Sequence, residues 1–221
     1  MTRSSLPLAV ALAASAGLLL SACGGGGSDS SDKIATSSTG PAATAAATTT
    51  ASATASDEVK RPSTALPKDL TMTFDWPRTG DATKDAVLRD GEQYVRALKR
   101  ASAEGDIKDP AYLFYSRDDA LSYAHDQIKA NIDGGWAPTG HDHYYAAKVG
   151  VVNSGSATLS FCRDQSKVFS KNVKTGKVVR GTPNADSFIL YNLLLVHDSA
   201  SNGVWQSSRI TVIEGAKQCR I

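Results

Sequence analysis

The chain has 221 residues, and its 24 basic and 22 acidic side chains give a formal net charge of +2. This balance excludes the basic footprint that nucleic-acid binding requires, and no polybasic cluster indicates a patch for acidic lipid. The length allows one or two domains. The composition of the first third is not that of a folded domain. About 155 residues remain, which is enough for one domain with its own core.

Residues 1–22 have the three-part pattern of an export signal. Arg3 gives a positive start, residues 6–20 are rich in Leu and Ala, and Leu20-Ser21-Ala22-Cys23 closes the segment. The apolar run is shorter than the about 20 residues that cross a bilayer. The closing tetrad resembles the lipobox of bacterial lipoproteins. An ordinary signal peptide with a coincidental cysteine is the alternative.

The lipobox resemblance implies that the leader is cut before Cys23 and that the cysteine thiol carries diacylglycerol. Each buried methylene contributes about 0.8 kcal/mol, and two acyl chains are sufficient for stable anchoring. We therefore expect membrane lipid as a partner through acylated Cys23. The expected location is the cell membrane, lipid-anchored, on the extracytoplasmic side.

Residues 24–65 consist mainly of Gly, Ser, Thr and Ala and have no hydrophobic periodicity. Such a segment cannot bury enough apolar surface to offset its chain entropy. The sequence therefore predicts a lipidated, disordered tether over 23–65, with an r.m.s. span of roughly 35–40 Å. A single domain over 66–221 follows it.

The first half of this domain has mainly helical periodicity. After a short strand at 71–76, apolar residues recur on one face between residues 84 and 102. Asp81 or Thr83 is the expected N-cap. The residues of the apolar face are Val87, Gly91, Tyr94, Val95, Leu98 and Ala101.

A break at Gly105 and Pro110 precedes a short helical turn at 112–115 and a second long helix. Ser116 and Asp119 have the spacing of a capping box for that helix, with Asp in place of Glu. Gly134-Gly135 is expected to end it. Its apolar stripe is Leu121, Ala124, Ile128 and Ile132.

The second half of the domain changes to a period of two, which predicts strands. The apolar segment 188–196 is expected to be central and covered on both faces. The fold class is therefore α+β, with N-terminal helices packed on a curved antiparallel β-sheet. The predicted strands cover 144–152, 157–162, 167–173, 178–179, 188–196 and 204–213.

Helices followed by a bent antiparallel sheet resemble the nuclear transport factor 2-like cone, and within that group the secreted lipoproteins of actinobacteria. The likeness covers about residues 82–221. It is carried by Gly135-Trp136-Ala137-Pro138, Cys162-Arg163-Asp164-Gln165-Ser166, Gly203-Val204-Trp205 and Gly215-Ala216-Lys217-Gln218-Cys219. The group contains isomerases, dehydratases, hydrolases and non-catalytic binding modules, so the resemblance implies no particular reaction.

Two cysteines remain once Cys23 is assigned to the lipid. An exported compartment favours disulfides, and adjacent strands could bring Cys162 and Cys219 together. A loop of about 58 residues predicts about 4 kcal/mol of stabilisation from chain entropy. The alternative is two free thiols, but no basic neighbourhood supports a reactive one.

Two clusters that contain histidine could carry chemistry. On a strand, His141 and His143 of His141-Asp142-His143 would share a face and could bind zinc. No third ligand has a recognisable spacing, and the alternative is a polar loop leading into a strand. His125-Asp126 could supply a general base. Neighbours on a helix do not face each other, so a core or rim histidine is the alternative.

Four tyrosines, Tyr94, Tyr115, Tyr145 and Tyr191, are spread through the expected core elements. They could line a ligand pocket, because tyrosine is apolar with one polar end. Packing in an ordinary core is the alternative.

No hydrolase elbow, phosphate loop, dinucleotide fingerprint or zincin helix occurs in the sequence. We assign no catalytic residue, no cofactor and no metal. The expected function is a non-catalytic binding or accessory module of the cell envelope. Its partner would be an envelope protein, a glycan or a small ligand, not nucleic acid. The alternative is a small-molecule enzyme of isomerase, dehydratase or hydrolase type that uses the cone cavity.

Overall fold

The structure, a computed structural model, describes residues 59–220. The predicted leader, Cys23 and most of the predicted tether lie outside the described residues. The elements are β1 (Leu70–Asp75), α1 (Ala82–Glu104), α2 (Pro110–Tyr115), α3 (Asp118–Gly134), β2 (Trp136–Asn153), β3 (Ser156–Asn172), β4 (Val178–Val179), η1 (Ala185–Ser187), β5 (Phe188–Val196), β6 (Gln206–Ile213) and η2 (Lys217–Cys219). No helix between residues 59 and 220 combines the length and the apolar character that crossing a bilayer requires.

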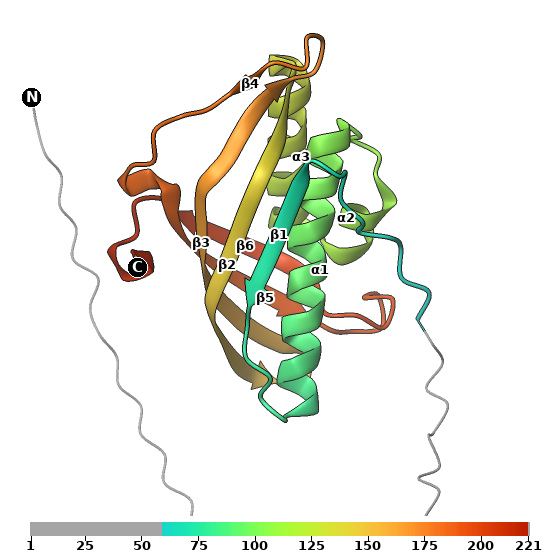
Figure 1. Ribbon diagram of the computed structural model, residues 1–221. Helices are drawn as coiled ribbons and strands as arrows, with labels where there is room; N and C mark the ends of the chain where they lie inside the picture. The colour runs from blue at the N-terminus through green and yellow to red at the C-terminus, as the bar shows by residue number, and fades with distance from the viewer. Residues whose placement is uncertain (1–58, 221) are drawn as a thin grey trace, which may run out of the picture. The chain divides into compact units, whose positions relative to one another are not determined.

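The six strands form one curved sheet in the order β1-β2-β3-β5-β6, with β4 paired to β3. The three helices lie together on one side of this sheet (Figure 1). The predicted α+β class, helices on a curved sheet, is therefore confirmed. One strand departs from the expected antiparallel pattern, because β1 pairs with β2 in parallel. The helices between β1 and β2 form the long crossover that parallel pairing needs.

The strands β2 and β3 are longer than the sequence pattern predicts. β2 begins at Trp136 instead of Tyr144, and β3 continues without a break through residues 163–166. The pairing of β2 with β3 shifts register between His141 and His143 and again between Tyr145 and Lys148. Such bulges bend a strand without ending it, so an irregular apolar pattern here does not mark the end of a strand.

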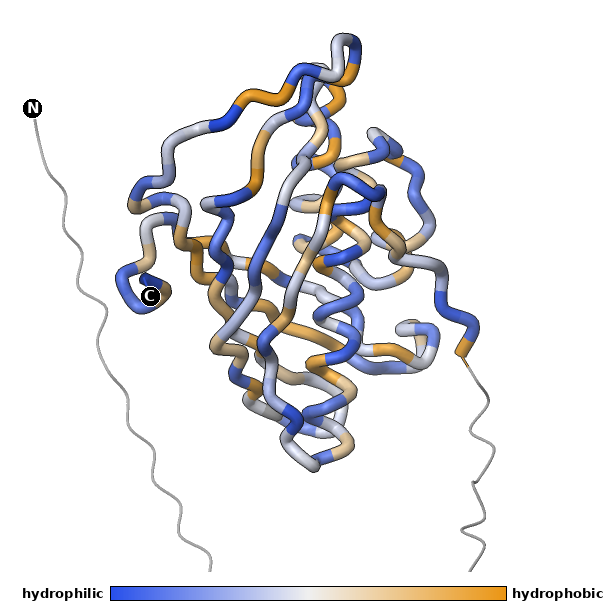
Figure 2. Tube along the Cα trace, in the orientation of Figure 1, coloured by the Kyte–Doolittle hydropathy of each residue, from blue (hydrophilic) through white to orange (hydrophobic). Residues whose placement is uncertain are grey.

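Helix α1 has the boundaries that its sequence signals favour. The side chain of Asp81 accepts hydrogen bonds from the backbone N–H groups of Thr83 and Lys84, which confirms Asp81 as the N-cap. Hydrophilic and hydrophobic segments alternate along α1 (Figure 2). The buried face approaches the sheet closely at Gly91, where a Cβ would lie 2.5 Å from Cδ2 of Leu159. Glycine at position 91 therefore lets α1 pack directly on β3.

The start of α3 differs from the predicted capping box. Arg117 is the N-cap of α3 and makes no capping bond with its side chain. Ser116 instead follows α2, and its Oγ donates to the carbonyl of Tyr112 over 2.5 Å. The capping-box prediction was wrong because Ser116 caps the preceding helical turn.

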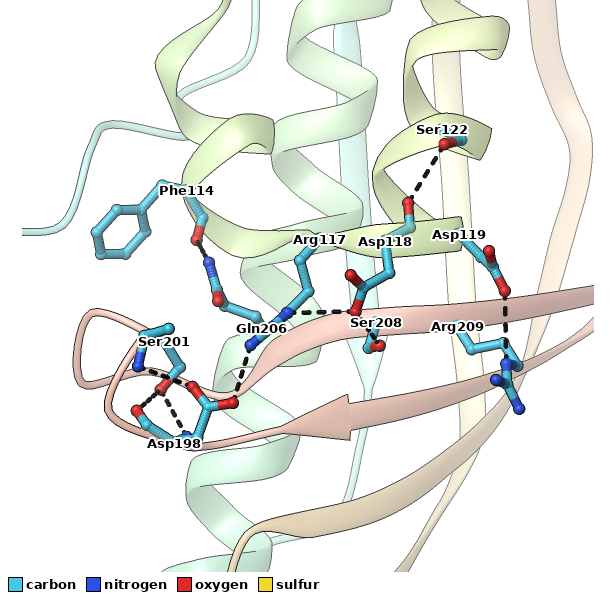
Figure 3. Close-up of polar contacts among 11 residues, drawn as sticks. Phe114, Arg117, Asp118, Asp119, Ser122, Asp198, Ser201, Gln206, Ser208 and Arg209 are labelled. Atoms are coloured by element: carbon cyan, nitrogen blue, oxygen red, sulfur yellow. Dashed lines mark hydrogen bonds and ion pairs between the residues drawn. The ribbon is translucent and has the colours of Figure 1, made fainter.

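Contacts to β6 and to the loop before it hold the start of α3 in place (Figure 3). Ser208 donates to Asp118 over 2.7 Å, and Arg117 donates to Asp198 over 3.0 Å. The Gln206 side chain donates to the carbonyl of Phe114 over 2.8 Å. These bonds hold the end of α2 and the start of α3 against β6 and the loop before it.

The strand β5 lies between β3 and β6, as a central strand should. Its residues alternate between buried and half-buried along the whole strand. The expectation that both faces are covered is therefore met only in part, because α1–α3 cover one face and the C-terminal turn covers the other only at Phe188 and Leu190. The residues that face the core are Ile189, Tyr191, Leu193 and Leu195.

Two further contacts tie the ends of the domain to its body. Arg61, in the last part of the predicted tether, donates to the buried carboxylate of Asp90 over 2.6 Å. At the other end, Cys162 and Cys219 form the expected disulfide, with 5.4 Å between their Cα atoms. Ordered contacts therefore begin before Leu66, and the last turn is held covalently against β3.

Candidate functional site: a cationic cavity between the helices and the sheet

A cavity of about 390 Å³ lies between helices α1 and α3 and the inner face of the sheet. The loop before η1 completes its wall. Its lining residues include Tyr94, Leu98, Lys99, Tyr123, Gln127, Asn131, Tyr144, Phe161, Arg163, Gln165, Thr182, Tyr191 and Leu193. This volume suits a small organic molecule.

Three charged side chains meet at this cavity. Arg163, from β3, donates from Nε to Oδ1 of Asp142 over 2.7 Å. Nζ of Lys99, from α1, lies 3.3 Å from Oδ2 of the same carboxylate. Arg163 and Lys99 line the cavity, whereas Asp142 is fully buried and does not. The cavity wall therefore carries two cations, and one carboxylate lies behind them.

The carboxylate of Asp142 is held in its ionised form. Burial alone raises the pKa of Asp142, but the charge of Arg163 and then that of Lys99 outweigh burial, so this pKa is lowered overall. The hydroxyl of Tyr144 also donates to Oδ2 over 3.0 Å. A carboxylate engaged in this way is a weak base, because taking up a proton would break the ion pair.

Lys99 is affected in the opposite sense. Burial, followed by the charge of Arg163, lowers the pKa of Lys99 to about 8 although Asp142 opposes the shift. Its side chain is 17% exposed. About one tenth of Lys99 is therefore the neutral amine at pH 7, while Arg163 keeps its charge.

Aromatic side chains surround the charged group. The rings of Phe161 and Tyr191 stack with centroids 5.2 Å apart. Nη1 of Arg163 lies 3.5 Å from the hydroxyl of Tyr191. Burial raises the pKa of Tyr123 and of Tyr144, so both hydroxyls stay protonated at neutral pH. The cavity thus combines apolar ring faces with neutral hydroxyl groups.

The histidines of the 141–143 cluster lie outside the cavity. His141 contacts Thr71 and Thr73, and Nε2 of His143 lies 2.7 Å from a carboxylate oxygen of Asp75. They share a face, as predicted, but it is the outer face of the sheet. Within residues 59–220, no group of three His, Cys, Asp or Glu side chains is placed to hold a metal ion.

His125 and Asp126 also lie away from the cavity. Their side chains are 48% and 78% exposed, and His125 Nδ1 is 3.5 Å from an Asp126 oxygen. His125 is therefore neither a general base in the cavity nor a core histidine, because this face of α3 points to solvent.

Two of the four tyrosines proposed as pocket residues, Tyr94 and Tyr191, line the cavity. Tyr115 and Tyr145 do not line it. Tyr115 is buried in the core, and the hydroxyl of Tyr145 donates to the carbonyl of Cys219. Tyr123 and Tyr144, which the sequence pattern did not single out, take part in the cavity wall.

The predictions from sequence did not include Lys99, Arg163 or the inward direction of Asp142. Strand alternation contains the signal for Asp142, because a residue between two outward-facing histidines must point inward. Arg163 likewise lies two residues after Phe161, on the apolar face of its strand. A charged residue on a core face is paired or functional.

No protein-family model matches the sequence, and a search of curated proteins found no match. Among solved structures, a ketosteroid isomerase-like protein from Erwinia carotovora atroseptica SCRI1043 is 16% identical with a TM-score of 0.41, covering 60% of this chain and 95% of that one. A protein from Catenulispora acidiphila is 11% identical with a TM-score of 0.41, covering 61% and 95%. The intermembrane space region of chloroplast protein ARC6 is 12% identical with a TM-score of 0.30, covering 62% and 99%. At these values the likeness shows no activity for this chain.

Proposed function

We propose that the protein is a lipid-anchored, extracytoplasmic binding protein whose cavity takes a small organic anion with a carboxylate group. The observation that carries this proposal is the charge balance of the cavity. Arg163 and Lys99 line the wall, and the single carboxylate of Asp142 neutralises only one of them. An anionic ligand supplies the missing charge and accepts hydrogen bonds from donors that Asp142 leaves free.

The donor geometry supports a carboxylate as the recognised group. A guanidinium has five N–H donors, and Asp142 and Tyr191 engage only part of them. The aromatic walls at Phe161 and Tyr191 fit an apolar or aromatic body attached to that carboxylate. The ligand is therefore an aromatic or short aliphatic acid.

The same observations favour binding over general base catalysis. Neither histidine nor a carboxylate is among the residues that line the cavity within the described part of the chain. Asp142, the nearest carboxylate, is held as an ion by Arg163. An α+β fold with a cavity is compatible with an enzyme or a binding module, and among the described residues of the cavity wall only the neutral fraction of Lys99 could act as a base.

Ligand binding is tested on the full chain in detergent by calorimetry with benzoate and with benzamide, its neutral analogue. We expect benzoate to bind and benzamide to bind at least about tenfold more weakly, because only the anion neutralises the cavity. Arg163→Met leaves Lys99 and Asp142 as a neutral pair, so it should remove benzoate binding. Arg209→Met, at an exposed arginine of β6, is the control. Equal binding of both probes, or unchanged benzoate binding by Arg163→Met, overturns the proposal.

The anchor is tested separately. Supporting it are the lipobox-like residues 20–23 and the polar segment that follows them. In a bacterial host supplied with an alkyne-bearing fatty acid, the wild-type chain should be labelled and lack residues 1–22, whereas Cys23→Ala should remain unlabelled. An unlabelled wild-type chain, or one that retains its leader by intact mass, contradicts the anchor.

A further inference from the structure

The amine of Lys99 lies where it can react as well as bind. Lys99 projects from α1 into the cavity wall, next to Val95 and Leu98, which also line the cavity. Its side chain is only 17% exposed, and its carboxylate neighbour among the described residues, Asp142, is shared with Arg163. Most lysines are solvated ammonium groups. The amine of Lys99 lies largely out of solvent and shares its counter-ion, Asp142, with Arg163.

A buried amine next to another cation is a nucleophile near neutral pH, because loss of its proton relieves both desolvation and repulsion. Asp142 is positioned to hold this amine without protonating it, since its carboxylate is bound by Arg163. The arrangement has the features of a carbonyl-reactive lysine.

We propose that Lys99 forms an imine with the aldehyde or ketone group of an anionic ligand whose carboxylate binds Arg163. This inference rests on the proposed function, because Arg163 must hold the anion. Lys99 and Arg163 contact opposite oxygens of one carboxylate, Oδ2 and Oδ1 of Asp142. Both groups therefore reach a short ligand, so the ligand class is a small oxo acid whose carbonyl lies close to its carboxylate.

The chemistry balances within the cavity. The neutral amine attacks the carbonyl carbon, forming a C–N bond, and the resulting carbinolamine loses its oxygen as water. Overall, the lysine ammonium and the carbonyl give a protonated imine and one water molecule, with no oxidant or reductant consumed. The positive charge stays beside Asp142, which stabilises the product as it stabilised the ammonium group.

The test uses glyoxylate, the smallest aldehyde acid, and the full chain in the presence of cyanoborohydride. The reductant delivers hydride to the imine carbon, and the adduct gains the mass of the probe less one oxygen. Peptide mass spectrometry compares the modification of Lys99 with that of exposed Lys148 in the same molecules. We expect Lys99 to react at least about tenfold faster, and we expect benzoate to slow Lys99 alone.

Two variants complete the design. Lys99→Arg keeps the positive charge beside Asp142 but has no amine that can form an imine, so it should abolish the fast modification at this position. Lys148→Arg, the matched change at an exposed lysine, should leave the fast reaction intact. Reaction of Lys99 no faster than Lys148, or insensitive to benzoate, overturns the imine. If benzoate still binds in that case, the proposed function stands, and if it does not, both proposals fall.

Discussion

Arg163 and Asp142 form an ion pair of 2.7 Å between β3 and β2, and their side chains are 7% and 0% exposed. Neither group has the solvent access that would stabilise its charge alone, so each stabilises the charge of the other. Lys99 then adds a second cation to the same carboxylate. The stability of the domain and the charge of its cavity therefore depend on the same three side chains.

Removing the carboxylate of this cluster should strongly destabilise the fold. Asp142→Asn leaves Arg163 and Lys99 facing each other without a counter-ion, and breaking a buried pair in this way costs about 3–5 kcal/mol. The free energy of unfolding, measured by urea denaturation at pH 7, should fall by that amount. Added benzoate should restore more stability in the variant than in the wild type, because it replaces the missing charge.

The control is the exposed pair of Lys129 and Asp133 on α3, whose side chains are 54% and 60% exposed. Asp133→Asn should change the free energy of unfolding by less than about 1 kcal/mol, since solvent screens such a pair. Equal losses for Asp133→Asn and Asp142→Asn would show that the buried cluster has no special role.

The lowered pKa of Lys99 predicts a specific pH dependence. The unfolded lysine titrates near 10.5 and the folded one at about 8, so between these values the unfolded state binds more protons. Stability must then rise with pH across this window. The wild type should gain about 1.5 kcal/mol relative to Lys99→Met between pH 8 and pH 9.5. Denaturant unfolding at several pH values measures this difference.

Tyrosine titration does not confuse this experiment, because the buried tyrosines are present in both proteins and their pKa values are raised. Lys148→Met, at an exposed lysine, should follow the wild type across the same range. If Lys99→Met and the wild type have parallel pH profiles, Lys99 is an ordinary lysine and its reactivity must be rejected.

The sequence was most informative where a local signal decides the structure. Asp81 caps α1 as predicted, and Gly135 ends α3 in the left-handed conformation. The period of two located the strands, but not their full length. Bulges keep Tyr144 and Lys148 in one strand although they interrupt the alternation. The parallel pairing of β1 had no local signal, because register between distant segments depends on tertiary packing.

The candidate site was less predictable than the fold. The histidines were candidate zinc ligands or a candidate general base because of their chemistry, yet His125, His141 and His143 lie outside the cavity. The site depends instead on Lys99 and Arg163, which are ordinary charged residues in sequence. Only their meeting at Asp142, from positions 43 and 21 residues away (142 − 99 and 163 − 142), gives them a role.

Asp90 should control the order of the segment before β1. Its buried carboxylate accepts hydrogen bonds from Arg61 over 2.6 Å and from the backbone N–H of Trp205 over 2.9 Å. Asp90→Asn removes the charge that both bonds use, which costs about 1.5–3 kcal/mol for each charge-assisted bond. Hydrogen exchange should accelerate at residues 60–66 and at the Trp205 amide. Lys68→Gln, at an exposed side chain, should leave both regions protected, and unchanged exchange in Asp90→Asn would contradict the role of Asp90.

The disulfide should contribute more to stability than any single polar contact of the last turn. Cys162 and Cys219 are 57 residues apart in sequence, and both are buried. Replacing both by serine releases that loop in the unfolded chain and should lower the free energy of unfolding by about 4 kcal/mol. Urea unfolding of the double variant and of the reduced wild type should give similar losses, because both lack the same crosslink. A loss by the double variant alone would assign the effect to the buried serine hydroxyls instead of the crosslink.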